Sequence, residues 1–96
     1  MTKEEILQFL KDNKSYLQSK FSVEKIGLFG SYAKNKNKED SDIDFYVILK
    51  NRTLDNMTGL WLYLEKKLQR KIDIVYNHPQ IRDGLKKEIE QEIIYE

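Results

Sequence analysis

The sequence predicts one α/β (α+β) domain, in which a small mixed β-sheet is flanked by helices. Segments whose apolar residues recur every three or four positions alternate with short segments rich in Ile, Val, Phe and Tyr. These two patterns are typical of amphipathic helices and of strands. A chain of 96 residues, 40% of them hydrophobic, can build a single core of modest size. No repeat or linker divides it, so residues 1–96 are expected to fold as one domain.

The expected elements follow the order α-β-α-β-α-β-α, which is typical of a sheet covered by helices. Their ranges are residues 2–20, 21–29, 31–36, 42–49, 54–69, 71–76 and the segment after residue 79. Thr2 and Glu5 have the spacing of a capping box, and Thr53 is a favourable N-cap residue. Gly27 lies inside the first strand, where glycine indicates a close backbone approach or a bulge.

Two of the expected helices have an apolar face. In helix 54–69 this face is predicted to consist of Leu54, Met57, Trp61, Leu64 and Leu68. In the last helix an apolar residue recurs every four positions, at Ile81, Leu85, Ile89 and Ile93. The tail, residues 93–95, is equally compatible with a short extended segment. These faces exceed what so small a sheet can cover, so we expect an exposed apolar surface that serves a partner or a second copy of the chain.

An acidic pair opens the second expected strand. Successive side chains of a strand alternate between faces, so Asp42 and Asp44 share one face, about 6.5–7 Å apart along the strand. The opposite face is apolar and consists of Ile43, Phe45, Val47 and Leu49. Two like charges this close raise each other's pKa unless a cation lies between them. The pair therefore indicates a site for a divalent metal, above all Mg²⁺, which prefers oxygen ligands.

Two other interpretations of this acidic segment have to be weighed. A solvated acidic turn explains most Asp-x-Asp sequences, but Asp44 lies among apolar strand residues rather than before them. In an EF-hand loop, Asp40, Asp42 and Asp44 would occupy positions one, three and five. That interpretation fails because Phe45 stands where the loop needs Gly, and Asn51 where it needs Glu.

A third carboxylate lies in the third expected strand. Asp73 stands between Ile72 and Ile74, in a segment that is otherwise apolar or aromatic. A charge in such a setting is costly unless it is paired or binds a metal. If the second and third strands are neighbours, Asp42, Asp44 and Asp73 converge at one edge of the sheet.

The turn before the short helix is a candidate anion site. Gly30 lets backbone N–H groups approach a phosphate, and Ser31 adds a hydroxyl at a helix start. The alternative is an ordinary turn in which Ser31 is only the N-cap. Three lysines follow before the acidic pair, Lys34, Lys36 and Lys38. They are compatible with phosphate binding and equally with a solvated loop.

Composition excludes several classes of protein. The formal net charge of +1 does not indicate broad attraction to nucleic acid or to anionic lipid. The absence of cysteine excludes disulfides, thiolate metal sites and cysteine nucleophiles. No apolar run approaches the ~18 residues that span a bilayer, and the first ten residues lack the apolar core of a signal peptide. We therefore expect a cytoplasmic protein that binds neither membrane nor nucleic acid.

These motifs together resemble a known signature. Gly30-Ser31, ten further residues, Asp42-Ile43-Asp44 and the strand aspartate Asp73 are similar to the pattern of the nucleotidyltransferase superfamily that includes polymerase beta. Length and element order resemble its minimal members, the MNT family, whose chains are often antitoxins encoded with HEPN-domain toxins. The resemblance covers nearly the whole chain and implies a polymerase-beta-like nucleotidyltransferase core.

The resemblance implies a role for each motif residue. Asp42 and Asp44 would bind two Mg²⁺ ions, or Mn²⁺ in their place, and Asp73 would be a metal ligand and the base that activates a hydroxyl. Gly30 and Ser31 would bind the triphosphate. One position departs from the pattern, because many relatives have Ala-Arg-Gly where this chain has Ala33-Lys34-Asn35. Lys34 keeps the charge of a phosphate contact but not the planar fork of arginine.

The implied reaction transfers a nucleoside monophosphate from ATP or another NTP to a hydroxyl. With few residues after the third strand, we expect a partner chain to supply the acceptor, and the resemblance implies the tyrosine hydroxyl of a HEPN toxin. The chain would then be an adenylyltransferase that acts as the antitoxin. Two alternatives are an antitoxin that neutralises by binding only and a small-molecule nucleotidyltransferase; the latter usually carries additional helical domains.

Overall fold

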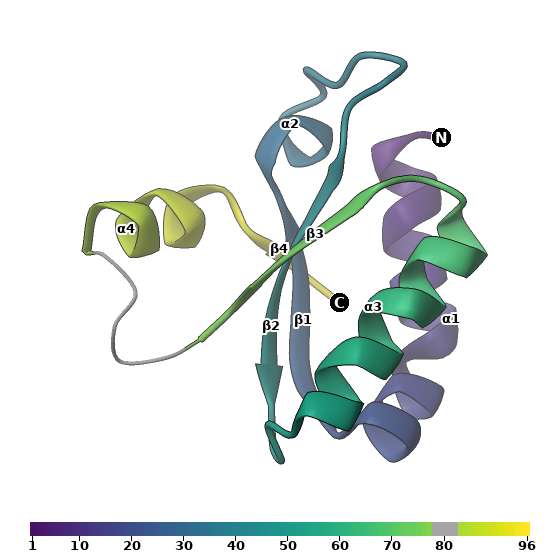
Figure 1. The fold of residues 1–96 in the computed structure, drawn as a ribbon. Helices are drawn as coiled ribbons and strands as arrows, with labels where there is room; N and C mark the ends of the chain where they lie inside the picture. Colours follow the sequence, from purple (N-terminus) through teal and green to yellow (C-terminus); the bar gives the residue numbers. More distant parts are fainter. Residues whose placement is uncertain (78–82) are drawn as a thin grey trace.

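A computed structural model describes residues 1–77 and 83–96 and confirms the predicted fold class (Figure 1). The element order repeats the predicted alternation and adds a short C-terminal strand. The elements are α1 (Lys3–Phe21), β1 (Val23–Phe29), α2 (Gly30–Ala33), β2 (Ile43–Leu49), α3 (Leu54–Leu68), β3 (Ile72–Tyr76), α4 (Asp83–Glu92) and β4 (Ile94–Tyr95).

The strands form one mixed sheet in the order β3-β2-β1-β4. β1 runs antiparallel to both of its neighbours, β2 and β4. β2 and β3 are parallel, and α3 makes the crossover between them. The order places β2, the acidic strand, between the Gly-Ser strand and the strand that contains Asp73. The three sequence motifs therefore lie on adjacent strands.

The helices cover the two faces of the sheet unequally. α1 and α3 pack side by side on one face, and the short α4 stands on the opposite side (Figure 1). The core lies between the sheet and the α1–α3 layer. Its fully buried residues include Ile6, Leu10, Leu17, Leu28, Ile43, Phe45, Val47, Leu60 and Leu64. We call the sheet face away from α1 and α3 the open face.

Local signals explain where the long helices begin. The Thr2–Glu5 capping box is confirmed: the Glu5 N–H donates to Thr2 Oγ1 (3.1 Å), and the Thr2 N–H donates to Glu5 Oε1 (2.9 Å). Thr53 caps α3 in the predicted way, because its hydroxyl accepts from the Asn56 N–H (3.1 Å). Such caps satisfy N–H groups that have no acceptor within the helix.

The predicted apolar face of α3 is wrong in part. Leu64 and Leu68 are buried as expected, but the third fully packed residue is Leu60, and Leu54 and Trp61 are 74% and 42% exposed. The helix directs its Leu60–Leu64–Leu68 row at α1 and the sheet. Met57 and Trp61 instead lie beside the edge strand β3.

At the C-terminal end the extended alternative is the observed one, because residues 94–95 form β4. Ile89 of α4 is buried as predicted. Ile81 and the side chain of Leu85, which belong to the same predicted face, lie outside the part of the chain that is described.

Gly27 shows the close approach that its position in a strand indicates. A Cβ there would lie 2.6 Å from Cγ1 and 2.8 Å from Cδ1 of Ile93, well inside van der Waals contact. Ile93, the residue that links α4 to β4, thus packs against the backbone of β1 at Gly27. The irregularity of β1 occurs elsewhere, between Val23 and Lys25.

Candidate active site

Asp44 and Asp73 are opposite each other in the parallel pair β2–β3. Residues in register on neighbouring strands direct their side chains to the same face. The alternate residues of β2, Ile43 and Phe45, are fully buried against the helices, so both aspartates face the open side. The structure therefore brings these two predicted site residues together.

Asp42 is exposed and immediately precedes β2. It acts on Asp44 through its charge, although it is not part of the strand ladder. Burial, followed by the negative charges of Asp73, Asp42 and Glu92, raises the pKa of the Asp44 carboxyl from 3.8 to about 6. Asp44 is thus the centre of a negative cluster on the open face.

Gly30 lies directly against this centre. Phe29, the last residue of β1, is in register with Asp44, and the chain then turns at Gly30 with φ +77°. A Cβ at Gly30 would overlap Oδ2 of Asp44 and lie 2.9 Å from its Cγ. The absence of a side chain therefore admits both the left-handed backbone and the Asp44 carboxylate.

Ser31 is not the N-cap of the short helix, contrary to the alternative interpretation of the turn. Phe29 occupies that position, and no side-chain hydrogen bond caps α2. Ser31 belongs to the first turn of α2, whose leading N–H groups have no acceptor within the helix. The helix itself is shorter than predicted: it ends at Ala33, and Lys34 is its C-cap residue.

Lys34 is engaged by the C-terminal helix. Its Nζ lies 2.7 Å from Oε2 of Glu92, the last residue of α4. Lys36 and Lys38 are exposed in the loop that follows. That loop is closed by the Lys38 N–H, which donates to Ser41 Oγ (2.7 Å). Of the three lysines, Lys34 is therefore the one that contacts an element bordering the aspartate cluster.

Glu92 is a site residue that the sequence interpretation missed. Its side chain is only 15% exposed, and it acts both on Lys34 and on the pKa of Asp44. Tyr46 was missed as well: it lies on the open face, and burial, with Tyr95 and Glu90, raises its pKa. The sequence did contain a signal for Glu92. It stands three residues after Ile89 and directly before Ile93, and so borders the apolar face of the last helix.

The donor set is compatible with a divalent cation. Asp44 and Asp73 offer hard oxygen ligands on one face, and their mutual repulsion is what a cation would relieve. Across residues 1–77 and 83–96, however, no group of three or more His, Cys, Asp or Glu side chains is arranged to hold a metal ion. Of the three carboxylates expected to converge, Asp44 and Asp73 are therefore cross-strand partners, and Asp42 acts on Asp44 through its charge.

The polymerase beta, nucleotidyltransferase family model matches residues 11–96. The chain belongs to this family. The matched range includes Gly30-Ser31, Asp42-Ile43-Asp44 and Asp73. The protein is therefore a nucleotidyltransferase.

Relatives and solved structures support this assignment. The nucleotidyltransferase is 35% identical over 96 residues to protein adenylyltransferase MntA of Thermococcus cleftensis, covering 99% of this chain and 96% of that protein. A solved structure described as a minimal nucleotidyltransferase is 29% identical and superimposes with a TM-score of 0.80, over 98% of this chain and 95% of that one.

A structure of tri-AMPylated Shewanella oneidensis HEPN toxin in complex with MNT antitoxin also contains a match. It is 20% identical with a TM-score of 0.62, over 93% of this chain and 70% of that chain. At this identity the likeness concerns the fold of the nucleotidyltransferase alone.

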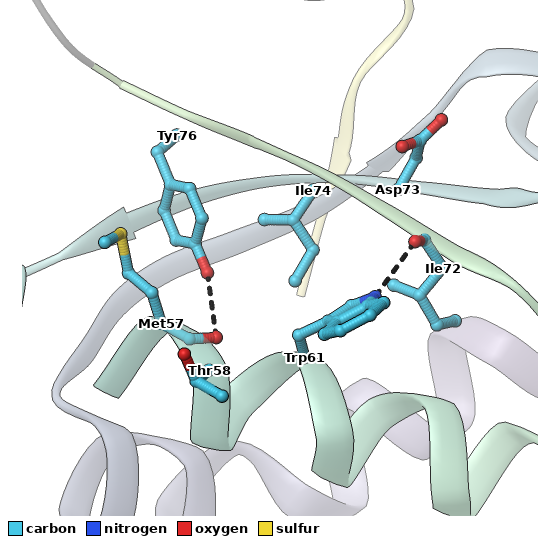
Figure 2. A pocket seen from close by; sticks show the side chains of 7 residues that line it. All are labelled: Met57, Thr58, Trp61, Ile72, Asp73, Ile74 and Tyr76. Atoms are coloured by element: carbon cyan, nitrogen blue, oxygen red, sulfur yellow. Dashed lines mark hydrogen bonds between the residues drawn. The ribbon is translucent and has the colours of Figure 1, made fainter. Parts of the chain in front are cut away.

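A groove of about 370 Å³ lies between α3 and β3, and Asp73 is among the residues that line it. In Figure 2, Ile72, Ile74 and Tyr76 point toward α3, while the Asp73 carboxylate points away from α3. Two hydrogen bonds span the groove: Trp61 Nε1–H donates to the Ile72 carbonyl (3.2 Å), and the Tyr76 hydroxyl donates to the Met57 carbonyl (3.4 Å). The apolar side chains of the groove and the aspartate cluster thus lie on opposite sheet faces, and Asp73 of β3 borders both.

Within residues 1–77 and 83–96, no helix combines the length and the apolar character that crossing a bilayer requires.

Proposed function

We propose that this chain is a Mg²⁺-dependent protein adenylyltransferase that transfers AMP from ATP to a tyrosine hydroxyl of a HEPN-type toxin and thereby acts as its antitoxin. The observation that carries the proposal is the face that Asp44 and Asp73 share beside Gly30. The 35% identity to MntA, named as a protein adenylyltransferase, supports the choice of AMP and of a protein acceptor.

Each residue has a distinct task in the proposed reaction. Gly30 and Ser31 bind the triphosphate through backbone N–H groups and the hydroxyl, and Lys34 adds a positive charge on the same side. Asp73 accepts the proton of the acceptor hydroxyl as its oxygen bonds to the α-phosphorus of ATP. The bond from the α-phosphorus to the bridging oxygen breaks, and the electron pair leaves with pyrophosphate.

Asp42, Asp44 and Asp73 would hold the metal. Divalent ions supply charge neutralisation and orientation to phosphoryl transfer, which demands little covalent chemistry of the protein. The raised pKa of Asp44 fits this task, since a carboxylate crowded by negative charge gains most from a bound cation.

The partner surface is proposed on α3. Leu54, Leu62 and Trp61 are 74%, 54% and 42% exposed, and Trp61 lines the apolar groove beside β3. Exposed apolar side chains grouped on one element are typical of protein–protein contacts. The likeness to a chain of the Shewanella toxin–antitoxin complex agrees with a HEPN partner, and in that complex the toxin carries AMP.

The decisive experiment is mass spectrometry of the partner. The protein is incubated with the toxin encoded beside it, MgCl₂ and each of the four NTPs in turn. The proposal expects a gain of AMP on a tyrosine and only with ATP. A different nucleotide would correct the substrate, whereas no gain with any NTP, alongside preserved neutralisation, would establish an antitoxin that acts by binding.

A further inference from the structure

The end of α4 is held on the open face by the chain segment that follows it. Ile93 lies over Gly27, whose missing side chain makes the space that Ile93 fills. Two residues of β4 then pair with β1, Gly27 with Tyr95 and Leu28 with Ile94. Glu92 directly precedes this anchored segment. Its backbone position is therefore defined by the sheet and not by α4 alone.

Glu92 uses this position to contact Lys34. The Nζ–Oε2 distance of 2.7 Å is that of a short, charge-assisted hydrogen bond. The two partners differ in exposure, 45% for the lysine side chain and 15% for the glutamate. The carboxylate is thus the fixed member of the pair and the lysine the adaptable one.

The pair lies at the border of the aspartate cluster. Glu92 is near enough to Asp44 for its charge to add to the rise in the Asp44 pKa. Lys34 is joined to the Gly-Ser turn through the backbone, because its N–H donates to the Gly30 carbonyl (3.2 Å). The backbone of Lys34 therefore contacts α2, and its side-chain ammonium contacts α4.

We propose that Glu92 is a positioning residue that holds the Lys34 ammonium at the phosphate side of the site. The proposal rests on the proposed function and adds a residue to it. A lysine is a flexible four-carbon stem with a compact charge, and it carries about 2 kcal/mol of rotamer entropy. It lacks the planar fork with which arginine orients itself on a phosphate. Glu92 restricts the rotamers of Lys34 before the nucleotide arrives.

Nucleotide binding does not require the pair to break. An ammonium group has three donors, so Lys34 can keep Glu92 and donate to a phosphate oxygen at the same time. Neutralising Glu92 should therefore weaken nucleotide binding, although it removes a negative charge from the neighbourhood of a polyanion. The direction of the change in nucleotide affinity distinguishes two roles of Glu92. If Glu92 positions Lys34, neutralising it weakens binding; if Glu92 only repels the phosphates, neutralising it tightens binding.

The first test measures the pair without any nucleotide. The protein is treated with a limiting amine-acylating reagent, and modification of Lys34 is compared with that of Lys36 by mass spectrometry. We expect Glu92→Gln to raise the rate at Lys34 and to leave the rate at Lys36 unchanged. Glu90→Gln on the same helix is the matched control and should change neither rate. An unchanged Lys34 rate in Glu92→Gln would overturn the proposal.

The second test is a double-mutant cycle of Lys34→Met and Glu92→Gln. The readouts are the Kd of the non-hydrolysable analogue AMP-PNP with Mg²⁺ and the KM and kcat of transfer. Glu92→Gln should raise Kd and KM about three- to fivefold, the scale of a half-exposed charge pair, with a smaller change in kcat. In the Lys34→Met background the same substitution should add nothing, because Glu92 acts through Lys34.

The outcomes separate this inference from the proposed function. Additive effects, or tighter binding in Glu92→Gln, would overturn the positioning role while the wild type still binds and transfers. A merely structural role would lower the melting temperature of Glu92→Gln and weaken binding equally in both backgrounds. A wild type that neither binds the analogue nor transfers AMP would refute the proposed function itself, and the positioning role with it.

Discussion

Asp44 and Asp73 are cross-strand partners on the open face of the sheet, and the space for the Asp44 carboxylate exists because Gly30 has no side chain. This relationship joins the three sequence motifs in one place. It also explains the electrostatics: a half-buried carboxylate with carboxylates around it binds protons more readily than usual. The ionised form of Asp44 is therefore destabilised in the folded protein, and a bound cation would stabilise it.

The first prediction concerns stability and pH without metal. The pKa of Asp44 is about 6 in the fold against 3.8 ordinarily, so the folded state binds more protons and stability falls as pH rises from about 4 to about 6. Asp44→Asn should therefore raise the free energy of unfolding at pH 7.5 by about 1 kcal/mol, after discounting for solvent screening. The melting temperature should rise by about 4–8 °C.

The gain from Asp44→Asn should disappear at pH 4, where Asp44 is protonated in the folded wild type. Asp40→Asn is the control, since it removes an exposed turn carboxylate. Thermal melts followed by circular dichroism at both pH values provide the measurement. Equal stabilisation at pH 4 and 7.5 would contradict a pKa of Asp44 raised by burial and by the neighbouring carboxylates.

The second prediction is that metal and nucleotide bind together. Mg²⁺ or Mn²⁺ with ATP should raise the melting temperature, because a ligand that binds only the folded state stabilises it by mass action. ATP with EDTA should give little shift. The double variant Asp42→Asn/Asp44→Asn should not respond, and an equal shift in that variant would place the ligand elsewhere.

The third prediction tests Gly30. In Gly30→Ala the new Cβ meets the end of the Asp44 side chain and requires a positive φ. The φ requirement alone should cost about 1–2 kcal/mol of stability. The side chain of Asp44 is flexible, so we expect the new methyl group to displace it and the protein to remain folded. Isothermal titration should then show a loss of Mg²⁺·AMP-PNP binding in a variant whose circular dichroism spectrum is native.

Gly84→Ala is a matched control for Gly30→Ala, because a Cβ at Gly84 meets no atom within 4 Å. It should bind like the wild type. Normal binding by Gly30→Ala would show that the Asp44 position is not important for the ligand.

The fourth prediction separates transfer from association. Asp73→Ala should reduce AMP transfer at least 100-fold, the usual contribution of a general base. Binding to the partner should remain, because the Asp73 carboxylate points away from α3, on which the partner surface is proposed (Figure 2). Mass spectrometry of the partner and size-exclusion chromatography of the mixture measure the two effects. Transfer at wild-type rate would remove Asp73 from the proposed mechanism.

The fifth prediction places the partner on α3. The double variant Leu54→Lys/Leu62→Lys should weaken association with the partner by at least tenfold, since desolvated apolar contacts dominate such interfaces. Nucleotide binding should be unaffected because the substitutions lie on the opposite side of the sheet from Asp44. Gln18→Lys, an exposed change on α1, controls for added charge. Unchanged association would move the interface away from α3.

Local sequence determined the elements and the faces of the strands. The Thr2–Glu5 and Thr53 caps act within one helical turn, and alternation along β2 separates Asp44 from Ile43 and Phe45. Both signals operate between residues close in sequence, so they can be detected without a fold. The pairing of Asp44 with Asp73 could be expected only on the assumption that their strands are neighbours, which the structure confirms.

Contacts between distant segments decided the rest. The row of α3 that enters the core begins at Leu60 and not at Leu54, because the position of α1 and not helical periodicity alone selects the buried face. Glu92 joins the site only because Ile93 lies over Gly27, 66 positions earlier in the chain, and β4 pairs with β1. The sequence by itself thus predicted the candidate site residues Gly30, Ser31, Asp42, Asp44 and Asp73, since residue type and local spacing can be recognised without a fold. Which charges act on one another was decided by the tertiary structure, because electrostatic energy depends on distance in space.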